Sequence, residues 1–256
     1  MSGDRGAAPG FRRRILVLPA RGQVTAELED DYHRMTVTLS HAEGIVVSVA
    51  AEMQRWPWTT CPGAVAQLSR TFVGRALSAV AGAGKKNRNC THLYDLTLLA
   101  ARHAADVGHA AYDVTVLDPV DGVAQATLRL NGRELLRWSL ARDLFVDAAM
   151  QGRRLGELRD WIATLDSGTA EAARILRWAT MMSRGRRIEI PERASDSKLR
   201  SGVCYTFQPD VARHALHTIG TIVGFAELGT EPLPHRAAHF GPHDMRGVLA
   251  EGGPPA

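Results

Sequence analysis

The sequence predicts an α+β fold: an antiparallel sheet from two hairpin regions, helices packed on one side of it, and a helical C-terminal part. Two observations support this prediction. Segments that alternate polar and apolar residues come in two groups, each with turn signals between its members. Segments with apolar residues at helical spacing lie between those groups and after the second one. A chain of 256 residues is long enough to bury the core of such a fold.

The first hairpin region contains two predicted strands. Residues 33–39 alternate polar and apolar side chains, residues 45–51 are rich in valine, and a turn sequence with Gly44 separates them. An apolar run flanked by arginines, residues 13–18, predicts one more strand before the hairpin. We interpret the acidic residues 27–31 as the segment that leads into the hairpin.

Two helices are expected after the hairpin. The first covers residues 62–76 with Cys61 as its N-cap, because proline is favourable just inside the start of a helix. The glycine-rich residues 81–87 predict a loop. The second helix covers residues 91–105 and follows Cys90 directly, so each helix begins at a cysteine.

The second hairpin region has a strong turn signal. Residues 112–117 and 123–130 are predicted strands, and Asn131-Gly132 is the dipeptide most typical of a tight hairpin turn. Residues 133–140 should therefore pair back on the preceding strand. The three strands are expected to be neighbours in sequence order.

The remaining chain is predicted to be helical and then irregular. Apolar periodicity predicts helices over residues 155–165 and 170–182, the second one with capping residues from Asp166 onward. Pro209 starts a last predicted helix, which runs to about Val223.

These elements predict a single α+β domain over residues 11–227. It is preceded by a polar lead of residues 1–10, expected to be disordered. It is followed by residues 228–256, expected to form a flexible tail that contains proline, glycine and histidine.

Composition narrows the class of partner. The net charge is +4, but the arginines are scattered and no basic stripe is interleaved with aromatic residues, so no nucleic-acid partner is expected. No run approaches the roughly 18–20 apolar residues that span a bilayer, and no signal peptide is evident, so no membrane partner is expected either. Three cysteines are an odd number, which argues against a disulfide framework. We therefore expect a cytoplasmic protein with reduced thiols, and a homodimer is left open.

Cys61 and Cys90 are the first candidate reactive residues. A thiol at a helix start lies at the positive end of the helix dipole, which favours the thiolate that attacks electrophiles or binds metal. Together with His92 they could supply three ligands to a metal ion or an iron–sulfur cluster. The alternative is that both are small buried apolar residues, as free cysteine commonly is.

Two histidines are candidates for proton transfer. His92 and Asp95 lie three residues apart on one helix, where the carboxylate could orient the imidazole as a general acid or base requires. Asp31 and His33 lie two residues apart and would share one face of a strand. The alternatives are a helix-start role for Asp95 and a solvated strand edge around Asp31.

A substrate pocket is expected around two tryptophans. Trp56 and Trp58 flank a proline that breaks the strand pattern, and Arg55 beside them could bind a charged substrate group. Tyr205 could complete the pocket from the C-terminal half, with its ring and its phenolic donor. No phosphate-binding glycine loop, dinucleotide fingerprint, nucleophile elbow or His-Glu-x-x-His motif is present, which disfavours nucleotide, hydrolase and metalloprotease functions.

Three motifs carry a resemblance to a known family: DDYH at residues 30–33, TCPGA at 60–64 and CTHL at 90–93. With Arg55-Trp56-Pro57-Trp58 and the later CYTFQP at 204–209, they resemble a bacterial domain-of-unknown-function family. The resemblance brings no established activity. It implies that His33, Cys61, Cys90 and His92 matter together, and it leaves their roles open.

The layout of a hairpin followed by two helix-start cysteines is also similar to iron–sulfur scaffold proteins of the NifU type. Those proteins use a third cysteine near the following helix, whereas Cys204 is far away in this sequence. The likeness is one of fold and does not assign a function.

The function expected from these residues is a small-molecule enzyme of lyase, isomerase or hydratase type that uses no nucleotide cofactor. His33 and His92 would move protons, Asp95 would orient His92, and Cys61 or Cys90 would act as nucleophile, acid or polar contact. Asp31, Arg55, Trp56, Trp58 and Tyr205 would bind the substrate. The alternatives are a metal or iron–sulfur scaffold built on Cys61, Cys90 and His92, and a non-catalytic protein that binds a small ligand.

Overall fold

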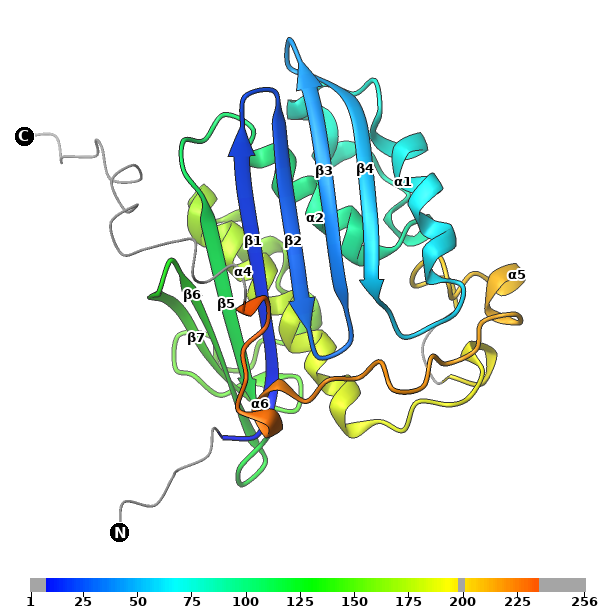
Figure 1. Cartoon of the computed structure of the whole chain (residues 1–256). Helices are drawn as coiled ribbons and strands as arrows, with labels where there is room; N and C mark the ends of the chain where they lie inside the picture. Colours follow the sequence, from blue (N-terminus) through cyan, green and yellow to red (C-terminus); the bar gives the residue numbers. More distant parts are fainter. Residues whose placement is uncertain (1–7, 198–200, 235–256) are drawn as a thin grey trace, which may run out of the picture.

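A single eight-stranded antiparallel sheet organises the chain in the computed structural model, which describes residues 8–197 and 201–234 (Figure 1). The strand order is β4-β3-β2-β1-β5-β6-β7-β8, so two meanders meet where β1 pairs with β5. The strands are β1 (Gly10–Ala20), β2 (Gln23–Asp30), β3 (Arg34–Ala42), β4 (Ile45–Arg55), β5 (Ala110–Leu117), β6 (Val123–Leu130), β7 (Arg133–Ala141) and β8 (Leu144–Phe145). The two hairpin regions and the α+β class predicted from the sequence are confirmed.

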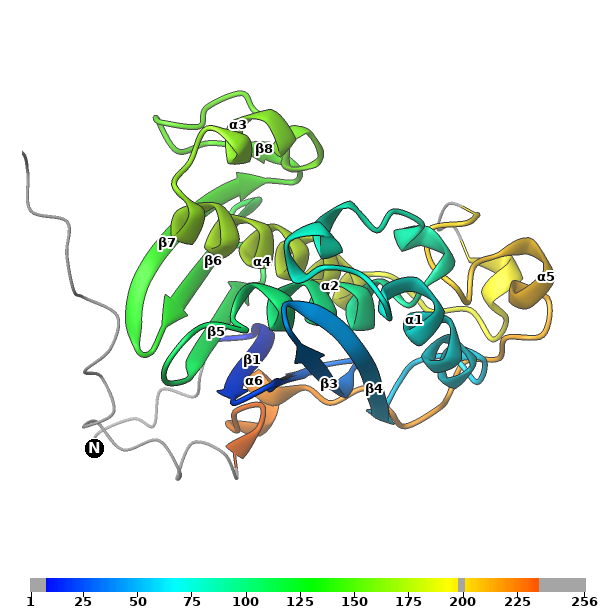
Figure 2. The ribbon, with the colours of Figure 1, turned by 90° about the horizontal axis from the view of Figure 1, so that it is seen from above.

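The longer helices cover one face of this sheet, as Figure 2 shows. α2 packs against β2 and β3, α1 packs against β4, and α4 packs against β5, β6 and β7. The short helix α6 lies on the opposite face against β1. The helices are α1 (Ala64–Phe72), α2 (Thr91–Arg102), α3 (Arg159–Ala163), α4 (Ser167–Ser183), α5 (Pro209–Ala212) and α6 (Phe225–Leu228). In the described ranges no helix combines the length and the apolar character needed to cross a membrane.

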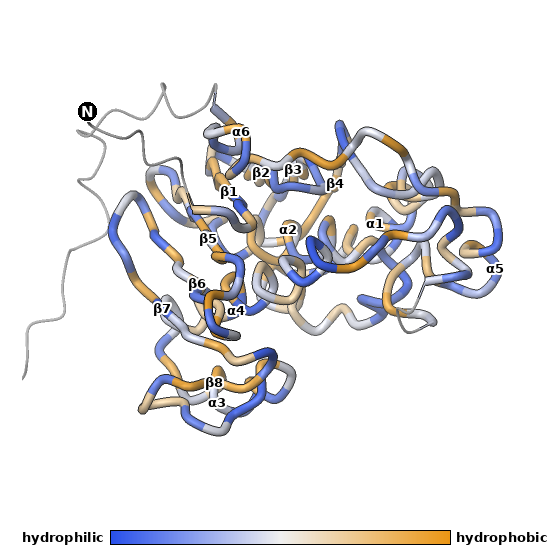
Figure 3. The backbone as a smooth tube through the Cα atoms, turned by 90° about the horizontal axis from the view of Figure 1, so that it is seen from below, coloured by the Kyte–Doolittle hydropathy of each residue, from blue (hydrophilic) through white to orange (hydrophobic). Residues whose placement is uncertain are grey.

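The core lies between the sheet and these helices, because strand residues alternate between the two faces. Hydrophobic and hydrophilic residues alternate along the strands in Figure 3. On β1 the helix-facing positions include Phe11 and Ile15, and on β2 they include Leu28. Arg13 and Asp30 occupy positions of the same alternation, and they are paired directly across β1 and β2. Two opposite charges therefore face the hydrophobic core.

Strand β2 was not predicted as a strand. The acidic residues 27–31 were interpreted as a lead-in to the hairpin, whereas all but the last belong to β2. Both faces of this strand are covered, so Glu27 and Glu29 are buried as well as Leu28 between them. Glu29 is an ion-pair partner of Arg55 and accepts a hydrogen bond from the backbone N–H of Leu233. Tertiary contacts, which the sequence pattern does not show, stabilise these carboxylates inside a strand.

Several predicted helices are shorter than expected. α1 ends at Phe72 because Gly74 has a φ of +82°, and the following residues pair with the start of β4. The helix predicted over residues 209–223 stops at Ala212, because Leu216 and His217 form bridges to Arg193 and Trp58. The region predicted as one helix over residues 155–165 is a 3₁₀ turn (Leu155–Glu157) followed by α3.

The chain ends differ in part from the prediction. Residues 1–7 and 235–256, most of the expected lead and tail, lie outside the described residues. Residues 228–234 were expected to begin the flexible tail. In the structure Leu233 is only 3 % exposed, and its N–H donates a hydrogen bond to Glu29. The ordered domain therefore continues beyond Leu228.

Candidate active site

Four polar side chains meet inside the core, and we call them the buried polar cluster: Arg13 on β1, Asp30 at the end of β2, His33 in the β2–β3 turn and His92 in the first turn of α2. Their exposed fractions are 1 %, 0 %, 4 % and 7 %. Burying a polar group without a partner is unfavourable, and buried ionisable groups with shifted pKa values gather at functional sites.

Asp30 is the centre of this cluster. Its Oδ2 accepts hydrogen bonds from Nε of Arg13 at 3.0 Å and from Nη2 of the same guanidinium. Its Oδ1 accepts the backbone N–H groups of Tyr32 and His33, both at 2.8 Å. These bonds close the turn between β2 and β3, so the same carboxylate shapes the backbone and holds the side chains.

The carboxyl group of Asp30 is ionised. Burial disfavours the charged form, but Arg13 and His33 outweigh it and hold the pKa of Asp30 well below its ordinary value. The carboxylate can therefore only accept hydrogen bonds.

His33 is oriented by this carboxylate. Its Nδ1 lies 3.1 Å from Oδ1 of Asp30. An ionised carboxylate has no proton to donate, so Nδ1 of His33 carries the hydrogen. In the neutral ring Nε2 then holds the free lone pair. This is the arrangement in which a carboxylate fixes the tautomer of a general base.

His92 is stacked on His33. The ring centroids of His33 and His92 are 3.8 Å apart, with 30° between the planes. The ring of Trp178 also packs on His92, with the two centroids 5.2 Å apart. Burial first, and then the nearby His33 and Arg13, lower the pKa of His92 well below its ordinary value. His92 is therefore neutral at physiological pH.

Two atoms of the buried polar cluster have no hydrogen-bond partner within the described part of the chain. They are Nη1 of Arg13 and Nε2 of His92, and both are fully shielded from solvent. The guanidinium of Arg13 also packs on Trp178, with its central carbon 4.3 Å from the ring centroid. A buried polar atom without a partner lowers stability, by about 1–3 kcal/mol, so its retention points to a function.

The donor atoms of Asp30, His33 and His92 lie within 4.8 Å of one another, a spacing compatible with a metal ion. The chemistry does not fit. Asp30 already accepts hydrogen bonds from Arg13, from His33 and from two backbone N–H groups, and the Arg13 cation would repel a metal. The two rings lie face to face, 3.8 Å apart with only 30° between their planes, whereas two imidazoles that bind one ion must point their lone pairs at a position about 2.0–2.1 Å from each. The arrangement favours proton transfer.

The cysteines are buried thiols and not thiolates. Cys90 directly precedes α2, as predicted, whereas Cys61, the predicted N-cap, begins a 3₁₀ turn (Cys61–Gly63) that precedes α1. Burial raises the pKa of Cys61 to about 11 and raises the pKa of Cys90 as well. The dipole argument was therefore wrong, because desolvation of a thiolate outweighs the field of a helix start. Among the described residues the ligand atoms of Cys61, Cys90 and His92 do not form a group with metal-ligand spacing.

These thiols should react slowly. We expect Cys61 and Cys90 of the folded protein to resist iodoacetamide at pH 7.5 and to react fully in denaturant, because the thiolate is the reactive species and burial suppresses it. Mass spectrometry of the alkylated protein checks this. Rapid labelling of Cys61 or Cys90 in the folded state would contradict it.

The carboxylates predicted to assist the histidines have other partners. Asp95 was expected to orient His92, but it is bound to Nζ of Lys86 at 2.6 Å and 2.7 Å. Asp31 was expected to act with His33 across a strand face. Residues 31–33 form the turn between β2 and β3 instead, and the adjacent Asp30 is the residue that binds His33.

Asp31 and Arg55 tie the fold together at this end of the sheet. The Asp31 carboxylate accepts a hydrogen bond from Arg186 at 2.7 Å, and burial raises its pKa to about 6. Arg55 donates to the backbone carbonyls of Asp31 and Thr221, at 2.8 Å and 3.1 Å. Both were predicted to bind substrate, yet these contacts link the β2–β3 turn to the C-terminal segment.

The predicted tryptophan pocket is a packed cluster. Trp58 is 6 % exposed and packs edge-on against Phe207, while Trp56 is half-buried beside it. The backbone N–H of Tyr205 donates to the carbonyl of Asn89, which places residues 204–206 against the starts of both helices. Cys61 touches this segment, with its Sγ 3.4 Å from Oγ1 of Thr206. The segment from the C-terminal half therefore lies against the helix starts.

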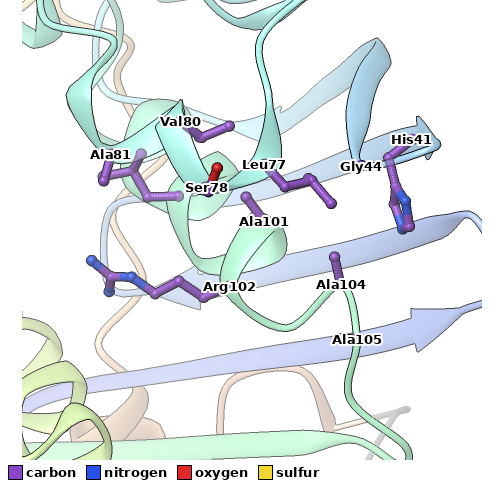
Figure 4. Close-up of a pocket in the computed structure, with 11 residues that line it drawn as sticks. His41, Gly44, Leu77, Ser78, Val80, Ala81, Ala101, Arg102, Ala104 and Ala105 are labelled. Carbon is purple, nitrogen blue, oxygen red and sulfur yellow. The ribbon is translucent and has the colours of Figure 1, made fainter.

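A cavity of about 510 Å³ lies elsewhere, between the β3–β4 turn, the 3₁₀ helix Leu77–Gly82 and the end of α2 (Figure 4). Its lining includes His41, Leu77, Ala101 and Arg102, and it includes none of the residues predicted to bind substrate.

Sequence reasoning missed Arg13, Asp30 and Trp178. A signal was present for the first two, because each charge interrupts the apolar alternation of a strand at a core-facing position. Trp178 lies inside a helix with ordinary apolar spacing, and nothing in its local sequence distinguishes it from other core residues.

Replacing His92 by phenylalanine should separate stability from function. His92→Phe removes the unpartnered Nε2 but keeps a ring that can stack on His33, so we expect the free energy of unfolding to rise by about 1 kcal/mol. Urea unfolding followed by circular dichroism measures this. Tyr32→Phe is the matched control, because the Tyr32 hydroxyl is also buried without a partner in the described residues. A clear loss of stability in His92→Phe alone would show that Nε2 has a structural role.

Residues 18–106 match the model of a family described as a protein of unknown function (DUF2889). This confirms the resemblance to a domain-of-unknown-function family. The matched segment contains Asp30, His33 and His92 but ends before Trp178 and begins after Arg13. No curated protein and no solved structure matches the chain.

Proposed function

We propose that this chain is a small-molecule enzyme of the lyase, isomerase or hydratase type, and that Asp30, His33 and His92 carry its acid–base chemistry without a nucleotide cofactor. The observation that supports the proposal most strongly is the hydrogen bond between Asp30 and His33 beneath the stacked, neutral ring of His92. The three reaction types share a step in which a proton leaves a carbon or oxygen atom of the substrate. The cluster supplies a base for that step.

In this proposal His33 is the base. Asp30 holds its Nδ1–H, so the lone pair of Nε2 accepts the proton and the ionised Asp30 stabilises the resulting imidazolium. His92 stays neutral because burial first, and then the nearby His33 and Arg13, lower its pKa. A neutral imidazole can donate or accept a hydrogen bond without adding charge.

The remaining predicted residues take supporting roles. Cys61 and Cys90 are protonated thiols, which suits polar contacts better than nucleophilic attack. All three cysteines are free, in agreement with a cytoplasmic location, and we propose a small molecule rather than nucleic acid or membrane as the partner. Thiolate metal chemistry is not part of the proposal.

Proton transfer at carbon can be tested without knowing the natural substrate. The protein is incubated in D₂O with a panel of small aldehydes, ketones and 2-oxo acids, and proton NMR follows the loss of signals from the hydrogens next to the carbonyl group. We expect faster exchange for at least one compound, and no such acceleration with His33→Asn. His214→Gln, at an exposed histidine, is the control and should behave as the unaltered protein.

Two outcomes would contradict the proposal. Exchange that is not accelerated for any compound would favour the alternative of a non-catalytic binding protein if the same compounds bind. Exchange that survives in both His33→Asn and His92→Phe would place the chemistry outside the cluster.

A further inference from the structure

The guanidinium of Arg13 is held so that one of its nitrogens faces away from Asp30. Asp30 engages Nε and Nη2, which form one edge of the planar group. The geometry of the fork places Nη1 on the other side. Arg13 is only 1 % exposed, and its Nη1 has no acceptor among the described residues.

The second atom without a partner belongs to the same cluster. Nε2 of His92 is buried and unbonded in the described part of the chain, and His92 is 7 % exposed. The His92 ring and the Arg13 guanidinium both pack on the ring of Trp178, at 5.2 Å and 4.3 Å. A permanent cation and a neutral imidazole thus contact the same aromatic side chain, each with an unused polar atom.

We propose that the substrate is an enolisable carbonyl compound whose oxygen binds between Nη1 of Arg13 and Nε2 of His92. The inference rests on the proposed acid–base function and names the class of substrate. Two donors that meet one oxygen stabilise negative charge developing there, and they are effective in a site that excludes water. A neutral histidine is suited to this role, because it donates its N–H without competing for the proton.

The step that follows is balanced within the protein and the substrate. Nε2 of His33 takes a proton from the carbon next to the carbonyl group. The electron pair of that C–H bond forms a C=C bond, and the carbonyl π pair moves to the oxygen. The resulting enolate oxygen accepts hydrogen bonds from Arg13 and His92. Return of the proton to the same or another carbon gives exchange or isomerisation, with no oxidant or reductant.

Trp178 is the side chain that would admit the substrate. Its ring contacts both Arg13 and His92, yet the residue is only partly buried, whereas those two are buried. Rotation of this ring would open the cluster towards solvent. Trp178→Phe, with a smaller ring, should therefore speed the entry of a small ligand.

Acetate is a suitable probe, because it is planar and carries negative charge on oxygen as an enolate does. We expect acetate to shift the nitrogen-15 NMR signals of the Arg13 side chain and of Nε2 of His92, with saturation in the millimolar range. Acetamide has the same shape without the charge and should shift them far less. Binding of acetate should weaken about tenfold in Arg13→Lys, which loses a charge-assisted hydrogen bond, and about three- to tenfold in His92→Phe. Tyr32→Phe should bind as the unaltered protein does.

The outcomes distinguish this inference from the proposed function. Acetate binding that is retained in His33→Asn, where the base is lost, would support the oxygen site even if no exchange at carbon is catalysed. Exchange that depends on His33 but is unchanged in His92→Phe would overturn the oxygen site and leave the acid–base function standing. Acetate shifts that are absent, or equal in His92→Phe and the unaltered protein, would also overturn it. Since Arg13→Lys alters a buried ion pair, His92→Phe decides the result if that variant fails to fold.

Discussion

Asp30→Asn is expected to destabilise the protein by about 3–5 kcal/mol, because removing one partner of a buried ion pair leaves the other charge uncompensated. Arg13 would remain fully buried, with no carboxylate to accept its Nε–H and Nη2–H. The β2–β3 turn would also lose an ionised acceptor for the backbone N–H groups of Tyr32 and His33. Urea unfolding monitored by circular dichroism measures the change.

Asp113→Asn is the matched control. Asp113 pairs with Arg14, the neighbour of Arg13, but the two side chains are 32 % and 16 % exposed. Water screens this pair, so its loss should change the free energy of unfolding by no more than about 1 kcal/mol. Equal effects of the two substitutions would show that burial of the Asp30 pair is not what stabilises the turn.

The ion pair of Arg13 and Asp30 should make the free energy of unfolding fall at acid pH. The pKa of Asp30 is lower in the folded than in the unfolded chain, so the unfolded state binds the proton more readily. The stabilisation is complete above the ordinary carboxyl pKa of 3.8 and is lost as the pH falls below it. Asp30→Asn should remove this part of the pH dependence.

His33→Asn is expected to lower the rate of the catalysed proton transfer by about 10²–10⁴-fold, the usual contribution of a general base. The amide nitrogen of asparagine can take the place of Nδ1 and donate to Asp30, so the turn and its carboxylate stay satisfied. The lone pair of Nε2 is lost, and with it the acceptor for the proton.

The readout is the deuterium exchange rate at saturating substrate, compared with the free energy of unfolding of the same variant. A base acts on the chemical step, so the loss should fall on kcat with little change in KM. A rate that falls only in proportion to the unfolded fraction would contradict a catalytic role for His33.

Much of the fold could be predicted from the sequence, because in the hairpins the alternation of polar and apolar residues and the turn residues indicate the same strands. Asn131-Gly132 and the valine-rich segment after Gly44 predict hairpins that the structure confirms. β2 was not predicted, because Glu27 and Glu29 are charged residues that are typical of a solvent-exposed segment. The contacts of Glu29 in the buried strand come from segments distant in the sequence. The predicted ends of α1 and α5 were wrong, because the residues that follow each helix form β-bridges with other segments instead.

The site was located in part. His33 and His92 were singled out, and the structure stacks their rings. Their carboxylate was misassigned because strand geometry was assumed through Asp31, and a shift of one residue in a strand moves a side chain to the other face. β2 ends at Asp30, so the turn begins there and brings that carboxylate to His33. Arg13 lies opposite Asp30 on the neighbouring strand β1, and pairing between strands is not local sequence information.

Nitrogen-15 NMR of the histidine rings tests the central claim most directly, which is that Asp30 fixes His33 beneath a neutral His92. With the rings neutral, His33 should carry its proton on Nδ1 and leave Nε2 unprotonated. His92 should remain neutral on titration to pH 5.5, below the ordinary histidine pKa of 6.5, because burial and its cationic neighbours lower its pKa well below that value. A His33 ring protonated on Nε2, or a His92 that becomes charged near pH 6.5, would contradict the account.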